Sequence, residues 1–192
     1  MNVPQAIDTS NVPRRHLLTQ QEYRLLDESG AFDRYAKTEL IEGQVFAVNA
    51  QFAKHARTHT ALFRALAAAC DHRTDGLQAW IEASVALGEH SMPQPDIVVA
   101  SSLPEKGPVP LDAISMVVEI ADTSLDYDLT TKARLYAEAG VAEYWAVDVN
   151  ARVIHQFWAP TGETFGERRE TAFGEPIVAA TIAGLSVETA SL

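Results

Sequence analysis

Two carboxylates of this chain stand in or against apolar segments, where an ionised group is costly. Asp96 directly precedes the apolar run Ile97–Val99, and Glu119 follows Val117 and Val118. A buried carboxylate must be paired or must hold a metal ion, so the two residues need a common explanation. Their oxygen atoms favour Mg²⁺ or Mn²⁺, with the backbone carbonyl of Ile120, water and a substrate phosphate as further ligands. Such an ion supplies what phosphodiester hydrolysis requires, an activated water and neutralisation of charge on phosphorus.

Lys132 is the candidate for a cation that orients the nucleophile or stabilises the transition state of that reaction. It lies four residues after Asp128, the favourable order for an ion pair along a helix. A surface ion pair is the commoner role of an isolated helix lysine. A chain with 26 acidic residues will also contain pairs of carboxylates by chance, so the residues alone leave both interpretations open.

A hairpin followed by a helix and a further strand is predicted to position these side chains. The connection from Ser101 to Ile114 is long enough to reverse the chain direction, so Asp96 would lie beside Glu119. Gly140 ends the predicted helix. The predicted strands are 95–99, 116–120 and 141–148, and the predicted helix is 126–138.

The remaining segments predict two more helices and several strands. Thr19 and Glu22 form a capping-box pattern at the start of a short helix that reaches about Glu28. The apolar spacing of Leu62 and Leu66 predicts a long helix. These segments are a hairpin or bent strand at 39–49, the long helix at 52–72, a strand at 77–87, and strands at 153–158, 165–173, 177–180 and 182–187.

Composition is that of an ordinary globular protein, with 47% hydrophobic and 21% charged residues. The single cysteine, Cys70, excludes an intrachain disulfide and a zinc site built on several thiolates. Residues 1–16 are interpreted as a flexible leader without the apolar segment of a signal peptide. No apolar run reaches the ~20 residues of a spanning helix, so we expect a cytoplasmic protein without a membrane partner.

The formal net charge of −11 argues against a general nucleic-acid coat. Residues 76–192 contain six basic and 17 acidic side chains, so a phosphate-facing surface should come from the first half. We place it on the long helix, although a solvated face is the ordinary alternative. The spacing of His55 and His59 also suits a metal-binding pair, but no third ligand stands close in sequence. The predicted nucleic-acid contacts are Lys54, His55, Arg57 and Arg64.

The candidate residues, taken together with the segment that ends in EYWAVD, resemble the putative restriction endonuclease family of the PD-(D/E)XK nuclease superfamily. The resemblance extends to ELIEG at 39–43 and to His55, and it covers about residues 17–188. The residues that carry it are Pro95, Asp96, Val117, Val118, Glu119, Ile120, Ser124, Asp128, Lys132 and the segment 135–148.

This resemblance implies an α/β fold, with a restriction endonuclease-like core of a central mixed β-sheet flanked by helices and extra C-terminal strands. Residues 17–192 would form one such domain. Asp96 and Glu119 match the family's metal ligands, and Glu39 matches an acidic position that could complete the metal site. The superfamily's lysine would fall at Ala121, so in this branch Lys132 of the next helix is expected to replace it.

Three functions are compatible with the sequence. The first is a Mg²⁺- or Mn²⁺-dependent endonuclease acting on DNA, with Asp96, Glu119 and Lys132 as catalytic residues. A homodimer is expected for this function, because cutting two strands suits a two-fold assembly. The second is a non-catalytic dimeric interaction or regulatory module on a nuclease scaffold, which the acidic charge and Ala121 favour. The third, hydrolysis of another phosphate ester, would use the same ligands.

Overall fold

The computed structural model describes residues 13–48 and 53–192, so most of the predicted leader at 1–16 lies outside the described residues. A six-stranded mixed sheet forms the centre, with the strand order β10-β9-β8-β7-β5-β3. Only β7 and β8 pair in parallel, and the other neighbours are antiparallel. The strands are β3 (Gln78–Ile81), β5 (Ile97–Ala100), β7 (Ile114–Ala121), β8 (Glu143–Asp148), β9 (Val153–Thr161) and β10 (Thr164–Ala172). The expected α/β fold with a central mixed sheet is confirmed.

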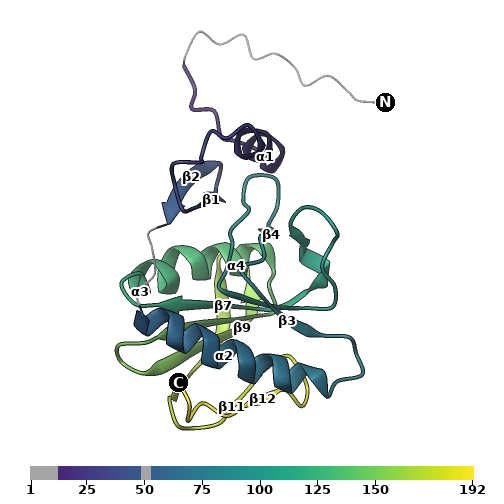
Figure 1. Ribbon diagram of the computed structural model, residues 1–192, viewed down its shortest axis with the longest axis vertical. Helices are drawn as coiled ribbons and strands as arrows, with labels where there is room; N and C mark the ends of the chain where they lie inside the picture. The colour runs from purple at the N-terminus through teal and green to yellow at the C-terminus, as the bar shows by residue number, and fades with distance from the viewer. Residues whose placement is uncertain (1–12, 49–52) are drawn as a thin grey trace.

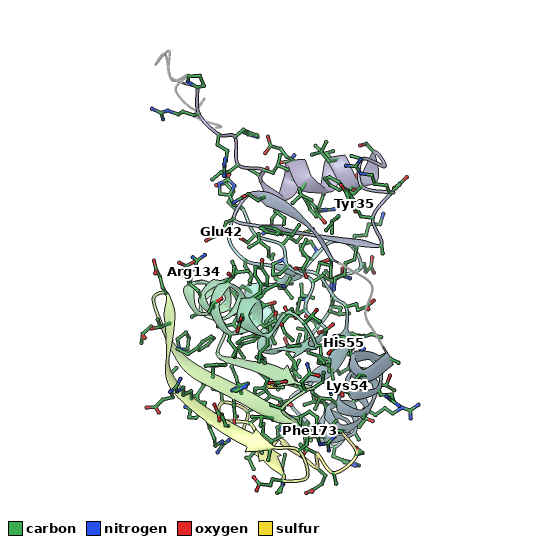
Figure 2. The ribbon with its side chains drawn as sticks, turned by 90° about the vertical axis from the view of Figure 1, so that its left-hand side faces the viewer. Tyr35, Glu42, Lys54, His55, Arg134 and Phe173 are labelled. Atoms are coloured by element: carbon green, nitrogen blue, oxygen red, sulfur yellow. The ribbon has the colours of Figure 1, made fainter. Side chains whose placement is uncertain are left out.

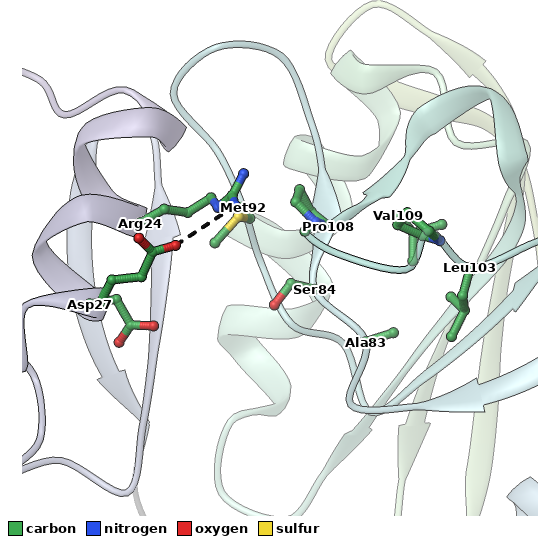
Figure 3. Close-up of a pocket in the computed structure, with 11 residues that line it drawn as sticks. Arg24, Asp27, Ala83, Ser84, Met92, Leu103, Pro108 and Val109 are labelled. Atoms are coloured by element: carbon green, nitrogen blue, oxygen red, sulfur yellow. Dashed lines mark ion pairs between the residues drawn. The ribbon is translucent and has the colours of Figure 1, made fainter.

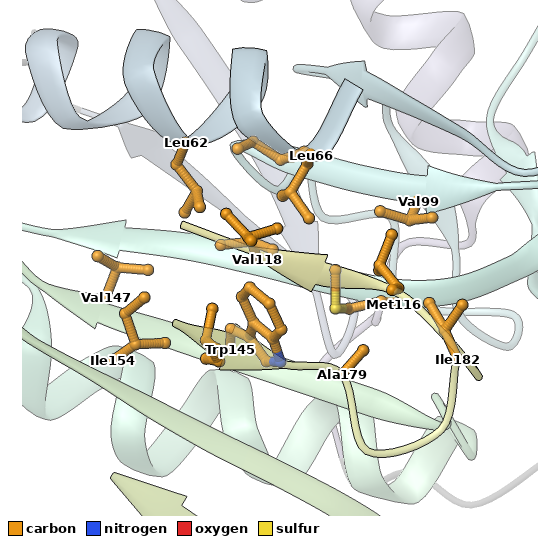
Figure 4. Packing of buried hydrophobic residues seen from close by; sticks show 14 of the residues in the cluster. Leu62, Leu66, Val99, Met116, Val118, Trp145, Val147, Ile154, Ala179 and Ile182 are labelled. Carbon is orange, nitrogen blue, oxygen red and sulfur yellow. The ribbon is translucent and has the colours of Figure 1, made fainter. Parts of the chain in front are cut away.

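The two faces of this sheet carry separate cores, because side chains alternate along each strand. On one face Val99, Met116, Val118 and Trp145 pack against helix α2 (Ala53–Asp71), as Figure 4 shows. On the opposite face Val98, Val117, Tyr144 and Ala146 pack against helix α4 (Ala133–Ala139). Every residue of β5 and β8 is buried, which explains their nearly continuous apolar sequences.

Three elements form a unit at the end of the molecule opposite β11 and β12 (Figure 1). They are helix α1 (Gln20–Glu28) and the antiparallel hairpin β1 (Lys37–Ile41) and β2 (Gln44–Val48). The predicted capping box is confirmed: the Glu22 backbone N–H donates to Thr19 Oγ1 at 3.2 Å, and the Thr19 N–H donates to Glu22 Oε2 at 2.8 Å. Arg134 of α4 ties the main body to the hairpin turn through an ion pair with Glu42 at 2.6 Å (Figure 2).

Two sequence predictions about element boundaries were wrong. The segment 77–87 is not one strand, because Glu82 has a φ of 50° and breaks the extended chain. Its first half is β3, and its second half is β4 (Val85–Ala86), which pairs with β6 (Val109–Pro110) in a separate small sheet. The segment 126–138 is not one regular helix either. It consists of α3 (Leu125–Tyr127), a π-helical turn (Asp128–Lys132) and α4.

The C-terminal strands extend the sheet and close one face of the core. β9 and β10 form a long antiparallel hairpin at the sheet edge, and β11 (Ile177–Val178) and β12 (Ser186–Val187) form a small sheet near α2. Glu143 on β8 is fully buried and accepts hydrogen bonds from five donors, including the backbone N–H groups of Ala180 and Thr181. Among residues 13–48 and 53–192, no helix is both long and apolar enough to cross a membrane.

Candidate functional site

The strand register brings Asp96 and Glu119 together, as the sequence predicted. Ile97 pairs with Val118 across the antiparallel strands β5 and β7. Asp96, which precedes Ile97, therefore lies opposite Glu119, which follows Val118. The backbone N–H of Ile120 donates a hydrogen bond of 2.7 Å to Asp96 Oδ2. The hairpin expectation is therefore confirmed, and both carboxylates are buried at the end of the same strand pair.

Both carboxylates line a cavity of about 620 Å³. Its walls come from β1, β2, the start of α2, the end of β7 and the turn into α4. The lining residues are Lys37, Glu39, Phe46, Ala47, Val48, His55, Asp96, Glu119, Ile120, Asp122, Thr123, Ser124, Tyr127, Asp128 and Lys132. We call this cavity the acidic pocket.

Another cavity, of about 290 Å³, lies between α1 and the loop at 103–109 (Figure 3). Its charged lining residues include Arg24 and Glu28, which pair across one helical turn at 3.9 Å. None of the candidate catalytic residues lines it. The chemistry predicted from the sequence therefore belongs to the acidic pocket.

Lys132 enters the acidic pocket from the π-helical turn and is 4% exposed. Its Nζ lies 2.8 Å from Glu39 Oε2 and 2.9 Å from Glu119 Oε1. Burial by itself would lower the pKa of Lys132, but the charges of Glu119 and Glu39 outweigh burial and raise it above its ordinary value. Lys132 is therefore a charged group held between two carboxylates, and π-helical turns are frequent at functional sites.

The carboxylates of Glu119 and Asp96 differ in how their charge is stabilised. Burial raises the pKa of Glu119, and the charges of Asp96 and Glu39 add to this although Lys132 opposes it. Tyr136 donates a hydrogen bond of 2.7 Å to Glu119 Oε1. Burial also opposes ionisation of Asp96, but His55 and the Ile120 N–H outweigh it, so the pKa of Asp96 is lowered. Asp96 is thus the more readily ionised of the two.

Asp128 is a residue of the site that the sequence assigned to a helix ion pair and to the family resemblance, but not to a role in the pocket. It is buried in the π-helical turn, and Ser124 Oγ donates to its Oδ2 at 2.6 Å. Burial, together with the charge of Glu119, raises the pKa of Asp128 to about 7. The signal in the sequence was its position one turn before Lys132, but the π-helical geometry that buries both residues has no simple sequence pattern.

The structure separates the four predicted nucleic-acid contacts into two groups. Lys54, Arg57 and Arg64 are exposed on α2, and Lys54 donates to Asn150 Oδ1 at 2.7 Å. His55 does not share this exposed surface, and its contact with nucleic acid stays a prediction. It is 4% exposed, and its Nε2 lies 3.2 Å from Asp96 Oδ2. The reason is helical spacing, because residue 55 lies on the buried face of α2 two turns before Leu62.

His59 and Glu39 also have defined partners. His59 Nε2 donates to the backbone carbonyl of Asp96 at 3.0 Å, so His55 and His59 contact different groups of one residue. Glu39 Oε1 accepts from the backbone N–H of Gln94 at 3.0 Å, and its Oε2 pairs with Lys132. Both oxygens of Glu39 are therefore engaged by protein groups.

A family model described as Uma2, putative restriction endonuclease, matches residues 20–190. This chain belongs to the Uma2 family. The crystal structure of a putative nuclease belonging to DUF820 from Anabaena variabilis ATCC 29413 is similar in fold, with a TM-score of 0.69 and 19% sequence identity. The similarity covers 91% of this chain and 96% of the other. A comparison with curated proteins found no match.

Membership in the Uma2 family supports a nuclease function, and restriction endonuclease-like families generally use divalent metal ions. The acidic pocket of this Uma2 chain contains carboxylate oxygens, the kind of donor that such an ion prefers. Its described lining residues include one buried lysine, Lys132, which contacts Glu39 and Glu119, and four buried carboxylates: Glu39, Asp96, Glu119 and Asp128. In the described parts of the chain, no group of three or more His, Cys, Asp and Glu side chains is arranged as metal ligands. Asp96 and Glu119 are therefore the two candidate ligands, and Mg²⁺ commonly binds through one or two carboxylates and keeps several waters.

Proposed function

We propose that this Uma2 protein is a metal-dependent endonuclease that hydrolyses phosphodiester bonds in DNA. One observation carries the proposal: Asp96 and Glu119 face one pocket from adjacent antiparallel strands, and Lys132 lies 2.9 Å from Glu119. Two carboxylates and a charged lysine are the groups that metal-assisted phosphodiester hydrolysis needs. The family match supports the same reaction class.

In this proposal Asp96, Glu119 and the backbone carbonyl of Ile120 hold Mg²⁺ or Mn²⁺. The bound ion supplies Lewis-acid polarisation of the phosphate and a more acidic water. Two contacts support the role of Asp96 as a ligand, because His55 and the Ile120 N–H fix its Oδ2 and favour its ionised form. Tyr136 fixes Glu119 in a similar way through Oε1.

Lys132 is proposed to stabilise negative charge on the phosphate as water attacks. Its raised pKa keeps it charged at neutral pH, and its position in the pocket places that charge next to Glu119. The sequence assigned Glu39 to the metal. Its contacts favour a different role, because it holds Lys132 Nζ while the Gln94 N–H fixes its other oxygen. We therefore propose Glu39 as a residue that positions Lys132.

The exposed basic residues of α2 are proposed to contact the DNA backbone beside the pocket. Lys54 and His55 are neighbours in sequence, so the basic surface begins where α2 enters the acidic pocket. Arg57 and Arg64 continue it along the helix. A homodimer, which would present two such sites to two strands, is part of the proposal and is tested by sedimentation velocity.

The experiment that tests the catalytic proposal compares three proteins on supercoiled plasmid with Mg²⁺ or Mn²⁺. Wild type should nick the plasmid, and Asp96→Asn should lower the rate at least 100-fold, because it removes a ligand charge but keeps the side-chain shape. Glu143→Gln is the matched control, since Glu143 is also fully buried but lies outside the acidic pocket. Thermal unfolding establishes that each variant is folded, and the control should keep its activity.

Retention of wild-type cleavage by Asp96→Asn would refute the assignment of Asp96. Thermal unfolding with added metal gives a second measurement, since an ion that binds only the folded state raises its stability. Stabilisation of wild type without any cleavage would favour the non-catalytic module, as would the absence of any response to metal.

A further inference from the structure

The acidic pocket has a second wall whose chemistry the proposed hydrolysis does not use. This wall is made by Phe46, Ala47 and Val48 of β2 together with Tyr127 from the turn after β7. The rings of Phe46 and Tyr127 lie 6.2 Å apart between centroids at an angle of 45°. Phe46 is 39% exposed, a large fraction for an aromatic ring. The pocket therefore joins an aromatic, apolar wall to the candidate catalytic residues.

Two buried polar atoms of the pocket residues have no hydrogen-bond partner among the described residues. They are the hydroxyl of Tyr127 and Nδ1 of His55. Burial raises the pKa of Tyr127, and the neighbouring charges that affect it are those of Lys132, Glu39, Asp128 and Glu119. Its hydroxyl thus lies close to the catalytic cluster. Both atoms are shielded from solvent in this structure, so neither offers a hydrogen bond to a ligand in the pocket without a movement of its side chain.

The size of the pocket limits that ligand. A volume of about 620 Å³ lies within the range of about 300–1,000 Å³ that is usual for small-molecule sites. It can hold a single nucleotide but not a double helix. A base inside a duplex is stacked on both faces, so it can reach an aromatic wall only when it is unpaired.

The charges around the pocket also disfavour a long run of phosphate contacts. Lys132 is occupied by Glu39 and Glu119. Lys37 donates to the backbone carbonyl of Gln94 at 2.7 Å and lies 4.0 Å from Glu39. With a net charge of −11, base stacking, which tolerates any sequence, is a favourable source of affinity for this pocket.

Building on the proposed nuclease function, we propose that the acidic pocket receives one unpaired nucleotide of the substrate. Its base stacks on Phe46 and Tyr127, and its phosphate lies toward Lys132. The substrate class is therefore single-stranded DNA, or a duplex in which one nucleotide is extruded.

Fluorescence anisotropy tests this inference without requiring cleavage. The probes are a fluorescein-labelled oligothymidylate of about 12 nucleotides, a fully paired duplex of about the same length, and that duplex with one bulged thymidine. Asp96→Asn protein with Mg²⁺ and wild type with EDTA are both measured. We expect the single strand to bind at least tenfold more tightly than the paired duplex. If the bulged duplex also binds tightly, the pocket accepts a nucleotide extruded from a duplex. If the bulged duplex binds as weakly as the paired duplex, the pocket accepts only a single strand.

Substitutions then assign the binding to the aromatic wall. Phe46→Ala should weaken single-strand binding at least fivefold, because it removes one of the two stacking rings. Tyr35→Ala is the matched control, since Tyr35 is also 39% exposed but does not line the pocket. The control should leave the affinity unchanged.

Equal affinities for the single strand and the paired duplex would overturn the inference, as would equal effects of Phe46→Ala and Tyr35→Ala. Loss of all binding to the three probes would also overturn it. The plasmid assay reads the proposed nuclease function separately. Plasmid cleavage that is unaffected by Phe46→Ala would leave that function standing while this inference fails.

Discussion

At the scale of single residues, the site depends on a balance between buried charges. Lys132 contacts Glu39 and Glu119 within 3 Å, so each partner offsets the desolvation of the other. Removing one member of a buried pair is far more costly than replacing the whole pair by neutral groups. Neutralising a carboxylate partner together with Lys132 should therefore restore stability without restoring catalysis, which separates the two contributions of Lys132.

We predict that Lys132→Met lowers the free energy of unfolding by about 3–5 kcal/mol, because Glu39 and Glu119 remain buried without their cation. The double variant Glu39→Gln/Lys132→Met should recover part of this loss, since one of the two carboxylates is then neutral. Neither variant should cleave plasmid. Urea unfolding in EDTA measures the stabilities, and equal stabilities of the two variants would contradict the ion-pair account.

Asp128 gives a prediction about pH. Its pKa of about 7 in the folded protein exceeds the ordinary value of 3.8, so the folded state binds the proton more tightly than the unfolded state. Below about pH 3 both states carry the proton; from about pH 4 the unfolded state releases it first, so stability falls as the pH rises toward 7, by at most about 1.4 kcal/mol per pH unit. Asp128→Asn should therefore be less sensitive to pH than wild type over this window.

The measurement is thermal unfolding of both proteins between pH 4 and 8 in EDTA. The difference in melting temperature should grow in favour of Asp128→Asn as the pH rises. Besides Ser124, the groups that act on Asp128 are Glu119 and Asp96 from the sheet and Lys132 from its own turn. A difference that stays constant with pH would show that Asp128 titrates normally.

The residues of the site differed in how readily the sequence revealed them. Asp96 and Glu119 could be predicted because a carboxylate in an apolar strand is conspicuous. Lys132 was a candidate from its place in the helix after Glu119, and the family resemblance favoured it, since nothing in a helix lysine distinguishes a buried ion pair from an exposed one. His55 could have been recognised as buried, because it lies seven residues before Leu62 on the face of α2 that contacts the core.

At the scale of elements, the hairpin of β1 and β2 must be placed accurately because it carries both Glu39 and Phe46. Gly43 in its turn has a φ of 74°, and an added Cβ would lie 2.5 Å from Leu17 Cβ and 2.9 Å from Leu17 Cα. Gly76 has a similar φ of 79° but nothing within 4 Å. Substituting each glycine by alanine therefore distinguishes the cost of an unfavourable φ, which both share, from the cost of steric overlap, which only Gly43 would have.

We predict that Gly76→Ala lowers the free energy of unfolding by about 1–2 kcal/mol, through the unfavourable φ alone. Gly43→Ala should lower it by about 1–3 kcal/mol more, because the turn must move away from Leu17. Denaturant unfolding of the two variants measures the difference. Equal losses would mean that the turn moves without cost.

The elements themselves were predicted better than their boundaries. Two features could be predicted from their apolar patterns, because tertiary packing requires the same patterns. These are the long helix and the pair of strands that carries the carboxylates. The break at Glu82 and the π-helical turn at 128–132 could not be predicted from such patterns. Both depend on local backbone geometry that is stabilised by distant contacts, such as the ion pairs of Lys132, and no short sequence window contains those contacts.

At the scale of the whole molecule, the acidic charge limits how the protein can hold a polyanion. The basic residues Lys54, Arg57 and Arg64 form an exposed stripe on α2, while the net charge is −11. If this stripe contacts phosphates, it should account for much of the salt dependence of binding. Each phosphate contact contributes about 0.7 to the slope of log K against log salt for a single strand.

We therefore predict that the triple variant Lys54→Ala/Arg57→Ala/Arg64→Ala reduces this slope by about 2. Anisotropy with the labelled oligothymidylate between 50 and 200 mM NaCl measures it. Phe46→Ala provides the comparison, since it should weaken binding without changing the slope. An unchanged slope in the triple variant would show that the stripe is only a solvated face.

The five hydrogen bonds that Glu143 accepts have a practical consequence for the C-terminal segment. Three of the donors belong to Ala180 and Thr181, so a chain shortened before Ala180 would leave a fully buried carboxylate without most of its partners. Such a fragment should be poorly folded, yet it would retain a binding site for the missing piece. Residues 180–192 supplied as a separate peptide are expected to restore it, which would make this protein a candidate for fragment complementation.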